Sequence, residues 1–181
     1  RGSLTPLVME AKDHEMGVLY GAALASEKTA AAEGTSGEMR QDPFAMLPFC
    51  GYNMADYFTH WLSIEKPGRK LPKIYTVNWF RKNEKGDFIW PGYGDNMAVL
   101  AWIFDSIDGK VEKKETPFGN LPASLNLEGI SVDAKALEEI LSLDEHAYEK
   151  EIERVADYFK ETYGEKFPKK LADRLRGMLS V

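Results

Sequence analysis

The chain has little cysteine, little histidine and no long apolar run. Its single cysteine, Cys50, excludes an internal disulfide, and its three histidines show no zinc-binding spacing with it or with one another. No stretch approaches the roughly 18 uninterrupted apolar residues of a membrane span, and the amino end lacks the apolar core of a signal peptide. These absences argue against secreted, zinc-binding and membrane-spanning classes. They favour a reducing, cytoplasmic compartment.

The chain also lacks an excess of positive charge. It carries 23 Lys and Arg against 29 Asp and Glu, a formal net charge of -6 over 181 residues. We therefore expect neither a nucleic acid nor a membrane as its main partner. Its composition, 44% apolar and 12% aromatic, provides for a sizeable core and excludes wholesale disorder. Its length predicts one domain over residues 1–181.

The amino-terminal half predicts strands and one core helix. Residues 6–11 and 17–23 are apolar and strand-like, with a turn-like KDHEM between them. Asn53 is placed to cap a helix over about residues 54–64, whose apolar residues recur at helical spacing. Residues 73–79, KIYTVNW, have the β-branched and aromatic composition of another strand.

The remainder predicts a hairpin and then helices. Residues 81–87 form the hairpin connection, and a helix starts near Asn96, with apolar residues at spacings of three and four. Those residues are Met97, Leu100, Ile103, Phe104 and Ile107. Three more helices are predicted near residues 133–143, 144–163 and 168–179. The fold class is therefore mixed α/β (α+β), a mixed sheet with helices and a helical carboxy-terminal end.

Residues 26–40, SEKTAAAEGTSGEMR, break all periodicity. Small residues and two glycines are typical of a surface loop that changes shape. A short Ala-rich helix ending in a glycine cap is the alternative for the first turn of this segment.

Residues 78–96, NWFRKNEKGDFIWPGYGDN, place five aromatic rings around turns. Phe80 and Phe88 flank a tight connection, and the neighbouring glycines hold Tyr93 on a constrained turn, which suits a slot for a flat ring. A base stacked on such rings gains about 1 to 3 kcal/mol, and Asn96 could read its hydrogen-bonding edge. In the alternative, which periodicity alone favours, the rings belong to the core and Asn96 only caps a helix.

Four segments resemble, in their amino-acid sequences and in their order along the chain, the carboxy-terminal part of the GTP-dependent phosphoenolpyruvate carboxykinases. The segments are PLVMEA from Pro6, GVLYGAALASEKTAAAEG from Gly17, DPFAMLPFCGYNMADYFTHWL from Asp42 and LPKIYTVNWFRKNEKGDFIWPGYGDN from Leu71. The resemblance implies a guanine pocket, with Phe80, Phe88 and Tyr93 around the base and Asn96 at its edge. Tyr93 stands where many relatives have phenylalanine, a change that keeps the ring.

The resemblance also implies an active-site lid and a phosphate contact. The family's lid falls on residues 26–40, and Arg1 matches an arginine that points at the transferred phosphate. The tip of the lid falls on Thr29, Ala30, Ala31, Ala32 and Glu33. The implied reaction converts oxaloacetate and GTP into phosphoenolpyruvate, GDP and carbon dioxide, with the lid excluding water.

The parts that this chemistry needs beyond the pocket are not in the sequence. It has no GxxxxGK[ST] phosphate loop, and no Lys, His and Asp constellation of the kind with which the family holds manganese. We therefore expect a fragment that is inactive alone, with the manganese and magnesium ligands in a missing amino-terminal part. A stand-alone module that binds a guanine nucleotide or a peptide without catalysis is the alternative.

Overall fold

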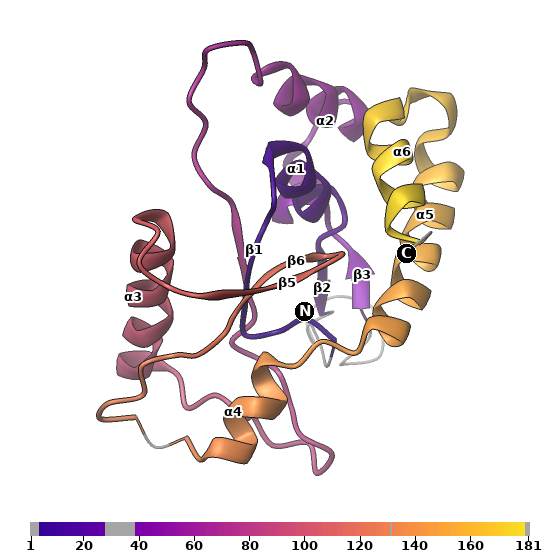
Figure 1. Ribbon diagram of the computed structural model, residues 1–181. Helices are drawn as coiled ribbons and strands as arrows, with labels where there is room; N and C mark the ends of the chain where they lie inside the picture. Colours follow the sequence, from indigo (N-terminus) through magenta and orange to yellow (C-terminus); the bar gives the residue numbers. More distant parts are fainter. Residues whose placement is uncertain (1–3, 28–38, 131, 180–181) are drawn as a thin grey trace. The chain divides into compact units, whose positions relative to one another are not determined.

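The computed structural model describes residues 4–27, 39–130 and 132–179 (Figure 1). Backbone packing divides the chain into two compact units. The first consists mainly of Asp13–Pro72 and Glu149–Val181, and the second of Gly2–Lys12 and Lys73–Tyr148. Each unit therefore joins segments that lie far apart in the sequence. The count of one domain over residues 1–181 stays a prediction.

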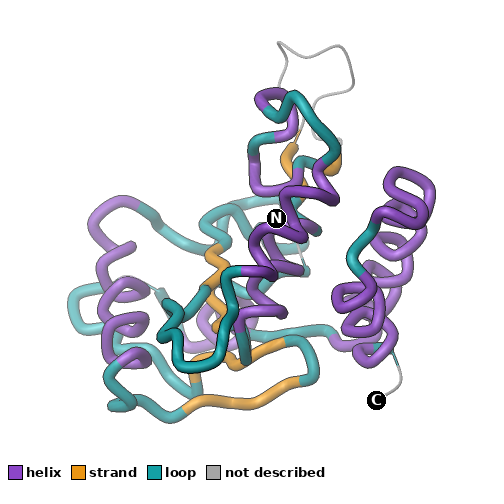
Figure 2. The backbone as a smooth tube through the Cα atoms, turned by 90° about the horizontal axis from the view of Figure 1, so that it is seen from above, coloured by secondary structure: helices purple, strands orange, loops and turns teal. Residues whose placement is uncertain are grey.

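The first unit is mainly helical (Figure 2). Its core is a cluster of rings in which Phe159 stacks on Phe167 with centroids 4.4 Å apart and Phe58 meets Tyr163 edge-on at 5.5 Å. The predicted helices near 54–64, 144–163 and 168–179 are confirmed. Its α-helices are α1 (His14–Ala22), α2 (Met54–Ser63), α5 (Glu145–Tyr163), which begins in the second unit, and α6 (Lys169–Met178). The 3-10 helix η4 (Gly164–Lys166) connects α5 to α6.

Helix α1 corrects the strand predicted over residues 17–23. The Asp13 side chain caps the helix by accepting a hydrogen bond from the Met16 backbone N–H at 2.8 Å. The helix is buried on more than one side, since Met16, Val18 and Leu19 are all buried. A helix buried all round has no apolar stripe, so its sequence reads like a buried strand.

A two-stranded antiparallel ribbon lies at the base of residues 26–40. Strands β2 (Ala25–Glu27) and β3 (Met39–Gln41) pair with Ser26 opposite Arg40. The buried Asp42 side chain accepts a hydrogen bond from Ser26 Oγ at 3.0 Å and another from the Leu47 backbone N–H at 3.2 Å. Two short 3-10 helices follow, η1 (Pro43–Ala45) and η2 (Leu47–Phe49). Both ends of residues 26–40, the segment predicted to be a lid, thus belong to paired β-strands.

The second unit is built on a four-stranded sheet in the order β4-β1-β6-β5. The strands are β1 (Val8–Glu10), β4 (Tyr75–Val77), β5 (Lys113–Thr116) and β6 (Gly119–Pro122). Every pairing among these strands is antiparallel, with Val8 opposite Val77 and Lys114 opposite Leu121. The mixed α/β class is confirmed, whereas the pairings described are those of an antiparallel rather than a mixed sheet.

Two helices and one 3-10 turn complete the second unit, η3 (Tyr93–Asp95), α3 (Asn96–Ile107) and α4 (Ala134–Leu141). The apolar stripe predicted for α3 is on the wrong face. Met97, Leu100, Phe104 and Ile107 are exposed, and the helix buries Val99, Trp102 and Ser106 instead. Of the predicted series, Ile103 alone packs against the core of the unit, where it is half-buried. The core of the unit comprises Leu7, Val8, Trp90, Val99, Trp102, Leu125 and Ile140.

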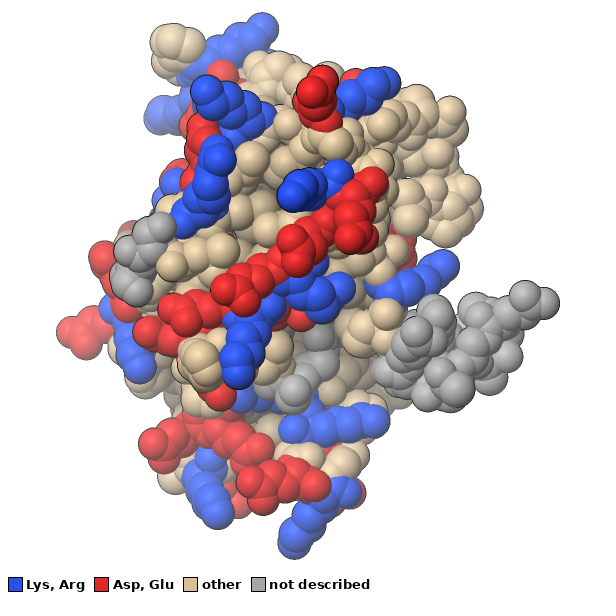
Figure 3. All heavy atoms as spheres, turned by 90° about the vertical axis from the view of Figure 1, so that its right-hand side faces the viewer, with Lys and Arg blue, Asp and Glu red and all other residues tan. Residues whose placement is uncertain are grey.

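The charged side chains of the chain are mixed in sign. On the face shown in Figure 3, Lys and Arg side chains lie among Asp and Glu side chains. Pairs one turn apart on a helix contribute to this pattern, such as Arg154 with Glu151 at 2.5 Å and Arg176 with Asp173. Within the part of the chain that the structure describes, no helix is both long enough and apolar enough to cross a membrane.

Candidate functional site

Two rings of the predicted slot lie against each other and remain exposed. The centroids of Phe80 and Phe88 are 6.1 Å apart and their planes meet at 66°, an edge-to-face contact. Their exposed fractions are 48% and 57%, so neither ring belongs to the core. Lys82 adds a cation over the Phe88 ring, with its Nζ 5.1 Å from the centroid. Phe80 and Phe88 therefore form an accessible aromatic pair.

The backbone around these rings is fixed by asparagine side chains. The buried Asn78 donates to the Thr5 carbonyl at 2.9 Å and accepts from the Phe80 N–H at 3.2 Å. Asn83 Oδ1 accepts from the Lys85 and Asp87 N–H groups at 3.0 Å each. These bonds close the predicted connection over residues 81–87. Only one bridge, Lys82 opposite Phe88, forms there, so the connection lacks a regular hairpin ladder.

Tyr93 lies on a constrained turn, as the sequence predicts. Its φ is 47°, in the left-handed region, and it follows Gly92 with φ 89°. The side chain is 96% exposed, and no described ring lies in contact with it. The convergence of Tyr93 with Phe80 and Phe88 on one cleft stays a prediction.

Asn96 is the first residue of α3, and its side chain is held by Trp90. The Trp90 indole N–H donates to Asn96 Oδ1 at 2.8 Å. Trp90 itself is 2% exposed and belongs to the core of the second unit. The side chain of Asp95, which precedes the helix, makes no capping hydrogen bond. Asn96 therefore places a side-chain amide at the start of the helix, and a core residue, Trp90, sets the orientation of this amide.

Sequence reasoning missed the role of Arg81, which directly follows Phe80 in the chain. This buried guanidinium donates to the Ser142 carbonyl at 2.7 Å and to the Ile140 carbonyl at 3.3 Å, both at the end of α4. Burial lowers the pKa of Arg81, and the negative charge of Glu139 opposes that shift. Arg81 thus ties the backbone next to Phe80 to helix α4.

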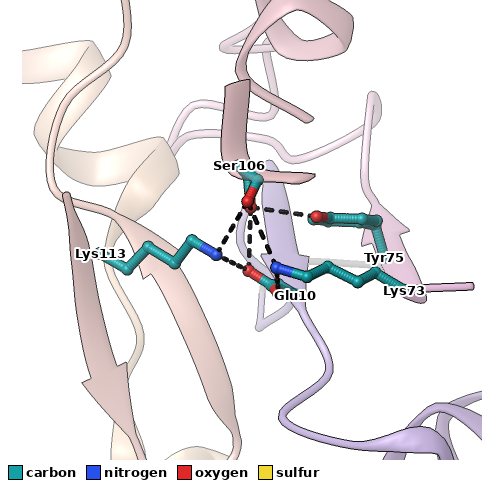
Figure 4. Close-up of polar contacts among 5 residues, drawn as sticks. All are labelled: Glu10, Lys73, Tyr75, Ser106 and Lys113. Carbon is teal, nitrogen blue, oxygen red and sulfur yellow. Dashed lines mark hydrogen bonds and ion pairs between the residues drawn. The ribbon is translucent and has the colours of Figure 1, made fainter. Parts of the chain in front are cut away.

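A second missed feature is a polar cluster around Glu10, Lys73, Tyr75, Ser106 and Lys113, whose side chains point toward one another (Figure 4). Glu10 pairs with Lys73 at 3.0 Å and with Lys113, and it accepts from Ser106 Oγ at 2.9 Å. Tyr75 Oη lies 3.0 Å from Ser106 Oγ. The cluster joins three strands to the end of α3, and so fixes the helix that begins at Asn96.

The charge on Glu10 is favoured despite its burial. Burial opposes ionisation, but the hydrogen bonds from Lys113, Lys73 and Ser106 outweigh it and lower the pKa of Glu10. The hydrogen bond to Glu10 in turn raises the pKa of Lys73, with burial opposing. A sequence signal was present, because Glu10 is a carboxylate inside a short apolar strand. Its partners, however, follow more than 60 residues later and no local pattern connects them.

The other predicted site residues lie outside the described part of the chain. These are Arg1 and the lid residues Thr29, Ala30, Ala31, Ala32 and Glu33. Of the segment predicted to be a lid, the structure describes the two ends, which pair in the ribbon of β2 and β3 up to Glu27 opposite Met39. Among residues 4–27, 39–130 and 132–179, no three or more His, Cys, Asp or Glu side chains gather as metal ligands.

Comparison with known proteins shows the family to which the chain belongs. Residues 1–180 match the family model described as the phosphoenolpyruvate carboxykinase C-terminal P-loop domain. The chain is 49% identical over 179 residues to phosphoenolpyruvate carboxykinase (GTP) of Chlamydia caviae. This match covers 97% of the present chain and 30% of the Chlamydia protein. It is 48% identical over 180 residues to the enzyme of the same name from Treponema pallidum strain Nichols, and 49% identical over 180 residues to that of Neocallimastix frontalis. For both, the match covers 97% of this chain and 29% of the relative.

The chain therefore belongs to the GTP-dependent phosphoenolpyruvate carboxykinase family, within which it matches the carboxy-terminal domain. The resemblance inferred from the four sequence segments is confirmed. The chain spans about 30% of the length of the curated relatives that it matches.

Proposed function

We propose that this chain supplies the guanine pocket and the active-site lid of a GTP-dependent phosphoenolpyruvate carboxykinase, a cytoplasmic lyase of gluconeogenesis. In this proposal Phe80, Phe88 and Tyr93 surround the base and Asn96 contacts its edge. The lid tip comprises Thr29, Ala30, Ala31, Ala32 and Glu33, and Arg1 faces the transferred phosphate. The reaction proposed for the whole enzyme converts oxaloacetate and GTP into phosphoenolpyruvate, GDP and carbon dioxide.

The observation that carries the proposal is the exposed contact between Phe80 and Phe88. Two large rings held together by a fixed backbone, and left in solvent, expose apolar surface that the fold itself does not cover. A flat base can cover it by stacking. Lys82 beside Phe88 adds a positive charge, which suits a ligand that carries phosphates.

Manganese and magnesium, which the family uses, find no ligand set among the described residues. We propose that the chain alone binds nucleotide weakly and does not catalyse phosphoryl transfer. Phosphoryl transfer needs positioned cations to offset the charge on the transferring group. The alternative, a binding module without catalysis, shares the aromatic pair but predicts no role for further parts of a carboxykinase.

Titration of the chain with GDP, with and without substitution of one ring, tests the pocket. Phe88→Leu should weaken GDP binding by about fivefold or more, since stacking contributes about 1 to 3 kcal/mol per base. Phe104→Leu is the control, because Phe104 is an exposed phenylalanine of α3 outside the aromatic pair. Equal loss in both variants, or no saturable GDP binding by the unaltered chain, would contradict the pocket.

A further inference from the structure

We propose that Trp90 is a positioning residue for base selectivity: its indole N–H fixes the Asn96 amide in the orientation that matches guanine and opposes adenine. This inference rests on the proposed guanine pocket. It adds a residue from the core of the unit, one that does not touch the base, to the groups that decide which base is bound.

The orientation of the amide follows from the chemistry of the bond. An indole nitrogen carries a hydrogen and can only donate, so the Asn96 atom that lies 2.8 Å from Trp90 Nε1 must be the carbonyl oxygen Oδ1 and not the amino nitrogen. Trp90 is 2% exposed and packed in the core cluster with Val99 and Leu7, so the donor cannot turn away freely.

The rest of the amide is available to a ligand. Within the described residues, Asn96 Nδ2 makes no hydrogen bond to the protein, so its two N–H groups can donate outward. Oδ1 has a second lone pair beside the one that Trp90 uses. The amide thus offers a donor from Nδ2 beside an acceptor at Oδ1. Guanine presents the complement, an acceptor at O6 beside a donor at N1–H.

Adenine presents the reverse order, a donor at the N6 amino group beside an acceptor at N1. An Asn96 amide turned over by a half rotation would match adenine as well as the observed orientation matches guanine. An asparagine alone is therefore ambiguous between the two bases. Turning the amide in this chain would place Nδ2 against the buried indole N–H, two donors facing each other, and would leave a buried donor without a partner.

The test replaces the donor and keeps an aromatic ring. Trp90→Phe removes the indole N–H, and Trp102→Phe is the matched control. Trp102 is 4% exposed and lies in the same core cluster, and its Nε1 finds no hydrogen-bond partner among the described residues. The ratio of the dissociation constants for ADP and GDP isolates the base, since both ligands carry the same diphosphate. A purely structural role for Trp90 would weaken both ligands together and leave the ratio unchanged.

The unaltered chain and Trp102→Phe should prefer GDP by about tenfold, and Trp90→Phe should bring the ratio close to one, because both amide orientations then become accessible. An unchanged ratio in Trp90→Phe would overturn the role of Trp90 and leave the guanine pocket standing. A ratio of one in the unaltered chain would overturn the pocket itself, and this inference with it.

A second measurement on the unaltered chain covers the case in which Trp90→Phe does not fold. Nuclear magnetic resonance of the ¹⁵N-labelled chain follows the Asn96 side-chain amide and the Trp90 indole N–H. GDP should shift the Asn96 Nδ2 protons more than ADP does, while the indole proton stays protected from exchange in both. Equal shifts with GDP and ADP, or rapid exchange of the indole proton, would overturn the inference.

Discussion

The Phe44 ring lies directly against the backbone of Gly21 in helix α1. A Cβ atom placed on Gly21 would be 2.7 Å from Phe44 Cε1, closer than such atoms approach in proteins. The ring cannot easily move, since it contacts Tyr57 edge-on at 5.1 Å and stacks near Trp61 at 6.0 Å. The absence of a side chain at Gly21 therefore allows helix α1 to pack against this aromatic group.

We expect Gly21→Ala to destabilise the chain by about 1 to 3 kcal/mol, because overpacking outweighs the better helix propensity of alanine. Gly177→Ala is the control within α6, where a Cβ would meet nothing within 4 Å. That change should be neutral or stabilise the chain by up to about 1 kcal/mol. Urea unfolding gives both values, and a stabilised Gly21→Ala variant would show that the ring can yield.

Removing the charge of Glu10 should destabilise the chain in a pH-dependent manner. Glu10→Gln should lower the free energy of unfolding at pH 7 by about 1 to 3 kcal/mol, since it breaks charged hydrogen bonds to Lys73 and Lys113. The pKa of Glu10 is lower in the folded than in the unfolded chain, so its ionisation stabilises the fold above the ordinary glutamate pKa. This stability is lost as the pH falls through the folded pKa.

Urea midpoints of the unaltered chain and of Glu10→Gln, measured between pH 7 and pH 3, test this sign. Their difference should shrink below the ordinary glutamate pKa of about 4.3. Glu115→Gln, at an exposed position of strand β5 in the same sheet, should have little effect throughout. A difference that stays constant into acid would mean that Glu10 acts through packing and not through its charge.

Arg81→Met should destabilise helix α4. The substitution keeps an unbranched aliphatic stem but removes the guanidinium N–H groups that donate to Ile140 and Ser142. We expect a loss of about 1.5 to 3 kcal/mol, as for other hydrogen bonds to charged groups. Amide exchange in α4 should also become faster than in α3. The exposed Lys85→Met should leave both measurements unchanged, and an equal loss in Lys85→Met would point to a general charge effect.

Asn96→Asp should abolish the preference for guanine without removing the bond to Trp90. A carboxylate oxygen can accept from the indole N–H, but the second oxygen then replaces the Nδ2 donor and faces guanine O6. GDP binding should weaken by about tenfold or more, and ADP should lose less. Asn126→Asp adds the same charge at an exposed site of the same unit, and titrations with both nucleotides should distinguish charge from hydrogen-bond pattern.

The elements that the sequence predicts well have one buried face. Helix α2 begins where Asn53 caps it, by accepting from the Ala55 N–H at 2.9 Å. Helix α5 buries Ile152, Val155, Phe159 and Tyr163, which recur in the sequence at the helical spacings of 3, 4 and 4. In both helices, local spacing and burial agree, so periodicity alone locates the core.

Helix α3 shows where periodicity fails. It has one apolar series through Met97, Leu100 and Phe104 and another through Val99 and Trp102, and both recur at helical spacing. Only the position of the sheet decides that Val99 and Trp102 are buried. Periodicity also fails to predict the Glu10 cluster, because the bonds of that cluster join residues that are distant in the sequence. The contact between Phe80 and Phe88, by contrast, was predictable from the sequence, because the two rings flank one short connection within a continuous segment.

The pairing of β2 with β3 has a consequence for changes in chain length. Ala25 lies opposite Gln41 and Glu27 lies opposite Met39. One residue inserted within either strand would shift this register by one position and turn the side chains of that strand to the other face. The Ser26 hydroxyl would then point away from Asp42, to which it donates at 3.0 Å. The paired strands therefore accept substitutions more readily than insertions.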